Sequence, residues 1–205
     1  MQGYILHLNP VKDEDLIVHI LTENRLKSTY RFYGARHSVI HVGYKIDFEP
    51  HYNLKSNLPQ LRNVLHLAHP WNANRERMLL WQQFLGLFYP HLKEVEGLEG
   101  FYCNLLDWCA LRWGKQNPKR IAIEAYIRVL KHEGRLIDPS TCFLCDKPID
   151  SKTALARSFL PAHPDCLHSK GFEQELLQTL YLEENTLHVN DENIEYLWRI
   201  LQEGI

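Results

Sequence analysis

The sequence predicts an α+β protein in which a small N-terminal β-barrel is followed by an all-helical domain. Two changes in pattern predict this architecture. Short apolar runs, some with a period of two, fill the first 70 residues, and apolar residues then recur at intervals of three and four. A stretch rich in cysteine and proline interrupts the second pattern near residues 138–168. We therefore place the two domains at residues 1–70 and 71–205.

Five short strands are expected in the first domain. They lie near residues 4–8, 16–22, 26–33, 40–48 and 61–67, and the last of these patterns is also compatible with a helix. An Asn9-Pro10 turn separates the first two runs, and Gly34 separates the third from the fourth. Five short strands in so few residues suit a barrel of the OB type, although an SH3-like barrel fits the pattern almost as well.

Helices are expected in the second domain near residues 78–88, 98–109, 118–132, 172–180 and 194–201. The third of these is the best marked, because Asn117 can cap its N-terminus, Pro118 suits its first position and Gly134 lies just beyond its end. Cys103 and Cys109 lie on the second helix, where we expect buried free thiols.

Two pairs of metal-ligating residues lie in segment 142–168. Cys142-Phe-Leu-Cys145 forms the first pair, and His163-Pro-Asp-Cys166 forms the second after seventeen intervening residues. Each two-residue gap allows a tight turn to present both side chains to one ion, and thiolates with imidazoles are the usual ligands of structural Zn²⁺. His168 is a rival for the fourth position. A closed site of four protein ligands leaves no place for substrate, so the expected Zn²⁺ is structural.

The charge is unevenly distributed along the chain. Residues 1–70 hold eight Lys and Arg against six Asp and Glu, whereas residues 141–205 hold five against eleven. From Arg25 to Ile46 there is no acidic residue. We expect a nucleic-acid surface on these strands, with Lys27, Arg31 and Tyr33 facing outward and Tyr30 and Phe32 facing the core. The candidate DNA-binding residues are Arg25, Lys27, Arg31, Tyr33, Arg36 and Lys45; a basic edge strand without a ligand is the alternative.

Other classes of protein find little support. The sequence contains no phosphate-binding glycine loop and no Gly-x-Ser-x-Gly motif, so we expect no enzymatic activity. It has no long apolar run of a membrane span and no apolar leader, so we expect a cytoplasmic, nucleoid-associated protein without a membrane partner. The competing hypothesis is a zinc-bearing module that binds protein or RNA.

Several short segments resemble one known family. Gln2-Gly-Tyr-Ile-Leu-His7, Glu14-Asp-Leu-Ile-Val18, Leu21-Thr22 and Gly34-Ala-Arg-His-Ser38 resemble the N-terminal domain of the bacterial recombination mediator RecO. The later cysteine cluster, which follows a helical stretch, is similar to the zinc region of that family. Two departures are that His163 stands where the third cysteine is usual, and that Asp146 stands where a glycine often follows the second cysteine.

The resemblance implies an OB barrel, a helical domain and a zinc site formed by Cys142, Cys145, His163 and Cys166. It implies binding of single- and double-stranded DNA, with Arg36 as the residue that carries over most directly. It further implies annealing of complementary strands and help in loading RecA. RecR and the acidic-hydrophobic C-terminal tail of single-strand-binding protein (SSB) would be the partners.

Overall fold

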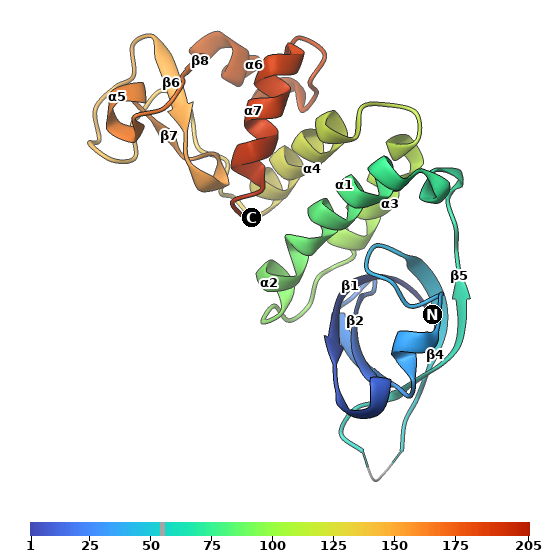
Figure 1. Ribbon diagram of the computed structural model, residues 1–205. Coiled ribbons are helices and arrows are strands. Elements are labelled where there is room, and N and C mark those ends of the chain that lie inside the picture. The colour runs from blue at the N-terminus through green and yellow to red at the C-terminus, as the bar shows by residue number, and fades with distance from the viewer. Residues whose placement is uncertain (54–55) are drawn as a thin grey trace. The chain divides into compact units, whose positions relative to one another are not determined.

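The N-terminal part of the chain is a closed five-stranded barrel, and Figure 1 shows its strands curling around a common axis. A computed structural model describes residues 1–53 and 56–205. The barrel strands are β1 (Gln2–Pro10), β2 (Leu16–Leu21), β3 (Leu26–Arg31), β4 (Lys45–His51) and β5 (Gln60–His66). They pair in the order β1-β2-β3-β5-β4, and only β3 and β5 run parallel among these pairs. This order is that of an OB fold, which confirms the expected barrel.

Two of the expected strands differ in detail from the observed ones. The run at 61–67 is a strand and not a helix, but the strand expected at 40–48 begins only at Lys45. Ile40 is nevertheless buried in the barrel core, because a turn places its side chain there. Apolar periodicity reports burial, and at this point the chain achieves burial without pairing. The core comprises Ile5, Leu16, Val18, Ile20, Ile40, Ile46, Phe48 and Leu61.

The compact unit that contains the barrel is Met1–Lys115, and its described residues include the α-helices that follow the strands. They are α1 (Arg75–Gly86), α2 (Phe88–Leu92) and α3 (Phe101–Trp113). Trp81 of α1 is fully buried, and its Nε1 donates to the carbonyl of Gly43 in the barrel at 2.8 Å. The hydroxyl of Tyr4 on β1 donates to Asp107 of α3 at 2.7 Å. The barrel strands end close to the boundary expected at residue 70, but the compact unit continues through α3.

The second compact unit is Gln116–Ile205. Its helices are α4 (Pro118–His132), α5 (Pro164–Leu167), α6 (Gln174–Glu183) and α7 (Asp191–Leu201). Asn117 caps α4 as expected by accepting from the amide of Lys119 at 3.0 Å, and Gly134 beyond its end has a φ of +66°. The unit is not all-helical, because β6 (Lys152–Leu155) pairs with β7 (Pro161–Ala162) and β8 (Phe172–Glu173) in a small sheet.

Two further sequence expectations concern α3 and the membrane. Cys109 is buried and Cys103 is half-buried, both as free thiols. Among the described residues, no helix combines the length and the apolar character that a membrane span requires.

Candidate metal centre and nucleic-acid surface

The first pair of candidate ligands lies in a tight turn at the end of a narrow hairpin. Thr141 pairs with Pro148 across the hairpin, and the amide of Cys142 donates to the carbonyl of Lys147 at 3.0 Å. The amide of Asp146 closes the turn on the carbonyl of Cys142 at 2.9 Å, and Asp146 itself has a φ of +57°. A left-handed residue is needed here, which explains why glycine suits this position and why aspartate, which tolerates it, can replace glycine.

The second pair of candidate ligands lies at the start of α5. His163 follows β7 directly and occupies the N-cap position, and Pro164 begins the helix. The amide of Cys166 donates to the carbonyl of His163 at 3.0 Å, so one helical turn places both side chains on the same side. Cys142, Ile149 and Ala162 form a small buried cluster, with Leu167 packed against it, that joins this turn to the hairpin.

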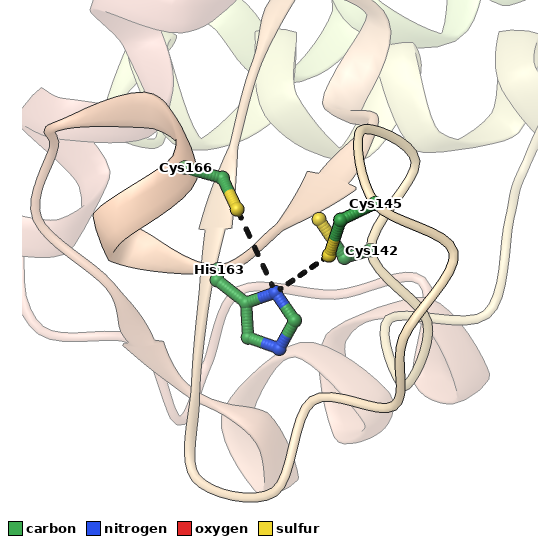
Figure 2. Close-up of side chains that lie close together, drawn as sticks. All are labelled: Cys142, Cys145, His163 and Cys166. Atoms are coloured by element: carbon green, nitrogen blue, oxygen red, sulfur yellow. Dashed lines mark hydrogen bonds between the residues drawn. The ribbon is translucent and has the colours of Figure 1, made fainter.

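The four side chains converge, as Figure 2 shows, with Cys166 entering from the short helix and the other thiols from the hairpin turn. Their ligand atoms all lie within 4.8 Å of one another. The Nδ1 atom of His163 lies 3.4 Å from the sulfur of Cys145 and 3.8 Å from that of Cys166. Its Nε2 lies 2.9 Å from the carbonyl oxygen of Pro148. A carbonyl can only accept, so Nε2 carries the proton and the Nδ1 lone pair faces the sulfurs.

The pKa values of two of the thiols indicate that the cluster suits a cation. Burial raises the pKa of Cys142, but backbone hydrogen bonds from His163, Leu144 and Cys145 outweigh burial and lower it to about 6. Burial and the neighbouring thiols raise the pKa of Cys166 to about 11. Three thiolates cannot share so small a space without a compensating positive charge. The donor set and its geometry therefore fit a metal ion, and these four residues could hold one.

The structure brings together the four residues that the sequence spacing predicts. His168, the rival for the fourth position, lies outside the cluster: it is exposed and caps α5 in a left-handed conformation. The local chain direction explains this, since α5 points Cys166 back towards His163 and ends before residue 168.

The candidate DNA-binding residues occupy several separate places on the barrel. The expected alternation along β3 is wrong, because Lys27 and Thr29 face inward and are buried whereas Phe32, just beyond the strand, is exposed. The ammonium group of Lys27 donates a hydrogen bond from Nζ to the hydroxyl of Tyr52 at 3.0 Å. A lysine can bury its apolar stem near the end of a small barrel while its ammonium group reaches a polar partner.

Two other candidates, Lys45 and Arg31, form contacts within the barrel unit. Lys45 forms an ion pair with Asp107 at 2.6 Å, and its side chain is mostly buried. Arg31 donates from Nη1 to the carbonyl of Leu61 at 2.7 Å, next to the parallel pairing of β3 and β5 that closes the barrel. Both contacts hold parts of the unit together, so these cations are less available to a ligand than the sequence suggested.

The remaining candidates, Arg25, Tyr33 and Arg36, are exposed. Arg36 lies over the ring of Tyr33 at 5.5 Å and pairs with Glu14. Two exposed aromatic residues near these cations were not predicted, Phe32 and Tyr52. The hydrogen-bonded ammonium of Lys27 and the charge of Arg25 hold the pKa of Tyr52 below its ordinary value. The sequence pattern gave no signal for Tyr52, because only the fold brings it next to Lys27.

The comparisons with known proteins address the barrel. The family model described as "RecO N terminal" matches residues 1–72. Residues 1–72 are similar to a RecO N-terminal domain. The match extends beyond the end of β5 into the short helical turn at Pro70–Ala73. It therefore covers all five strands of the barrel. No curated protein matches the chain.

Proposed function

We propose that this chain is a non-enzymatic mediator of DNA repair and recombination that binds single- and double-stranded DNA. In this proposal it anneals complementary strands and, with RecR, assists the loading of RecA onto DNA coated by SSB. The match of residues 1–72 to the RecO N-terminal family is the observation that carries the proposal, since it supports a role in DNA repair. The finer steps are expectations drawn from the family.

The surface of the RecO-type barrel supports DNA as the ligand. Arg25 and Arg36 are exposed cations near the two ends of β3, and the sequence from Arg25 to Ile46 contains no acidic residue. Exposed rings accompany both cations, Tyr52 near Arg25 and Tyr33 beneath Arg36. Positive charge with interleaved aromatic rings is how small barrels hold nucleic-acid strands.

Charge reversal at these two positions tests the proposal. We expect Arg25→Glu with Arg36→Glu to weaken binding of single-stranded DNA about tenfold or more at low salt. Each lost phosphate contact should also lower the slope of log affinity against log salt by about 0.7. Fluorescence anisotropy titrations at several salt concentrations measure both quantities. Arg31 is left intact, because its contact with Leu61 supports barrel closure.

Two further variants make this test specific. Arg75→Glu with Lys93→Glu changes the charge equally at exposed positions of α1 and the end of α2, and should bind as the unmodified protein does. Glu14→Gln should strengthen binding, because it frees Arg36 from its ion pair. Unchanged affinity and slope in the first variant would place the DNA site elsewhere, and a preference for RNA of the same sequence would favour the competing RNA-binding module.

We propose that the ion held by Cys142, Cys145, His163 and Cys166 is Zn²⁺. Thiolate and imidazole donors at a single point favour zinc over the harder cations magnesium and calcium. Four protein ligands fill a tetrahedral site, so the ion would stabilise the hairpin and α5 and would not take part in a reaction.

We propose that the acidic-hydrophobic tail of SSB binds in a pocket of the barrel unit. It has a volume of about 530 Å³ and is lined by Trp71, Ala110 and Leu111, with Arg77 and Lys115 as cations. Apolar walls with positive charge suit an acidic-hydrophobic peptide. Lys115→Glu should weaken binding of a tail peptide about tenfold in calorimetry, whereas Lys93→Glu should leave it unchanged. Equal binding by both variants would contradict this placement.

A further inference from the structure

Two aromatic rings are exposed at the turn that follows β3. Phe32 and Tyr33 have 51% and 54% of their surface exposed, and neither contributes to the barrel core. They adjoin the short helical turn η2 (Gly34–Arg36), whose Arg36 lies over the ring of Tyr33. Adjacent exposed rings beside a guanidinium group are the kind of side chains that gather at binding surfaces.

The turn is held in one conformation by Asp15. This residue is buried, and each of its carboxylate oxygens accepts one hydrogen bond: from the amide of Tyr33 at 2.6 Å and from the hydroxyl of Tyr30 at 2.5 Å. Tyr33 adopts a left-handed conformation with a φ of +50°, which costs a non-glycine residue roughly 1 kcal/mol and is maintained by these contacts.

Gly34 brings the turn close to the barrel. A side-chain carbon at this position would lie 2.9 Å from Leu16, so only glycine allows the approach. The ring of Tyr30 packs edge-to-face against that of Phe32, with 5.0 Å between centroids. This contact restricts the orientation of the Phe32 ring. The two exposed rings are therefore presented by a rigid support, and a ligand that stacks on them would lose little conformational entropy in the protein.

We propose that Phe32 and Tyr33 form a stacking platform for unpaired DNA bases, with Arg36 binding the adjacent phosphate. This inference rests on the proposed function and adds to it that the barrel distinguishes unpaired from paired bases. Each base has two flat faces that can stack on a ring, but a duplex hides those faces between neighbouring base pairs. The stretch from Arg25 to Ile46 carries no acidic residue, and the two carboxylates that reach the turn, those of Glu14 and Asp15, are paired with Arg36 and with the two tyrosines. The guanidinium group of Arg36 beside the rings favours an anionic ligand over an apolar protein partner.

An abasic strand separates stacking from attraction to phosphates. The unmodified protein is titrated by anisotropy with oligothymidylate and with an abasic single strand of equal length. We expect it to bind oligothymidylate about ten- to hundredfold more tightly, which is the scale of one or two stacked bases. Phe32→Leu with Tyr33→Leu keeps apolar side chains but removes both rings. It should abolish the preference while leaving affinity for the abasic strand and its salt dependence unchanged.

The control is Leu65→Ala, which removes an exposed apolar side chain from β5 of the same barrel and should retain the full preference. Thermal unfolding shows whether the leucine variant folds as the unmodified protein does. A platform elsewhere is indicated if that variant keeps the preference for oligothymidylate. Equal binding of both strands by the unmodified protein overturns the stacking proposal and leaves the electrostatic one standing. Binding of neither strand at low salt overturns the proposed function as well.

Discussion

Replacing Cys142 by serine is expected to abolish metal binding and to unfold the hairpin that carries it. Cys142 is fully buried and belongs to the small cluster with Ile149 and Ala162. Serine offers no thiolate, and a metal-coupled fold loses the free energy of binding when one ligand is lost, which reaches about 10 kcal/mol in small zinc domains. Elemental analysis should show zinc falling from about one ion per chain to almost none.

Chelation of the unmodified protein should produce the same local unfolding. Hydrogen exchange then detects it as faster exchange of amides in residues 141–167, including that of Cys142, which bonds to Lys147. His168→Ala is the matched control, because this residue lies outside the cluster and should leave the zinc content unchanged. His163→Cys should also retain the ion, since a thiolate replaces an imidazole. A full complement of zinc in Cys142→Ser would show that these residues do not hold it.

The metal cluster could be predicted from the sequence because its geometry is local. Each pair of ligands lies within one turn of the chain, and the two-residue gap brings the two side chains of a pair to the same side. The meeting of the two pairs depends on the small cluster that joins the hairpin to α5. The symmetric spacing favoured His163 over His168 as the fourth ligand, but the decision required the fold, because it depends on where α5 ends. The support of the Nε2 atom of His163 by the carbonyl of Pro148 likewise required the fold.

The barrel shows what the pattern of a strand leaves undetermined. The five strands could be predicted from their patterns, but their order could not, because an SH3-like barrel fitted the same patterns almost as well. The faces of β3 are opposite to those expected. Hydrophobicity favoured Tyr30 and Phe32 for the interior. The structure instead buries Thr29, whose hydroxyl donates to the carbonyl of Val18 at 3.2 Å, and gives Tyr30 a partner in Asp15. Polar residues can face a barrel interior when their hydrogen bonds are satisfied, and sequence periodicity does not report those partners.

The contact between α1 and the barrel was also beyond prediction from sequence. Periodicity identified the apolar face that contains Trp81, but not the surface that covers it. In the fold, Trp81 lies between two parts of the unit. Its ring contacts Tyr4 of β1 at a centroid distance of 5.9 Å and Trp113 of α3 at 4.8 Å. Its Nε1 bonds to the carbonyl of Gly43. One side chain therefore joins strands and helices that are distant in sequence.

Trp81→Ala is consequently expected to destabilise the unit of residues 1–115 by about 3–5 kcal/mol, the usual cost of a cavity left by a buried tryptophan. Since small proteins are stable by only about 5–15 kcal/mol, this change should remove a large share of the free energy of unfolding of the unit. Trp81→Phe keeps most of the packing but leaves the carbonyl of Gly43 without its donor, so its cost should be about 1–3 kcal/mol.

Urea denaturation followed by circular dichroism measures these free energies of unfolding. Leu79→Ala is the control on the same helix, where the side chain is 55% exposed and its loss should change stability by less than about 0.5 kcal/mol. If Trp81→Ala cost no more than this control, α1 would not depend on Trp81 for its attachment to the barrel. The intermediate value for phenylalanine matters most, because it separates the packing of the ring from the hydrogen bond that fixes its orientation.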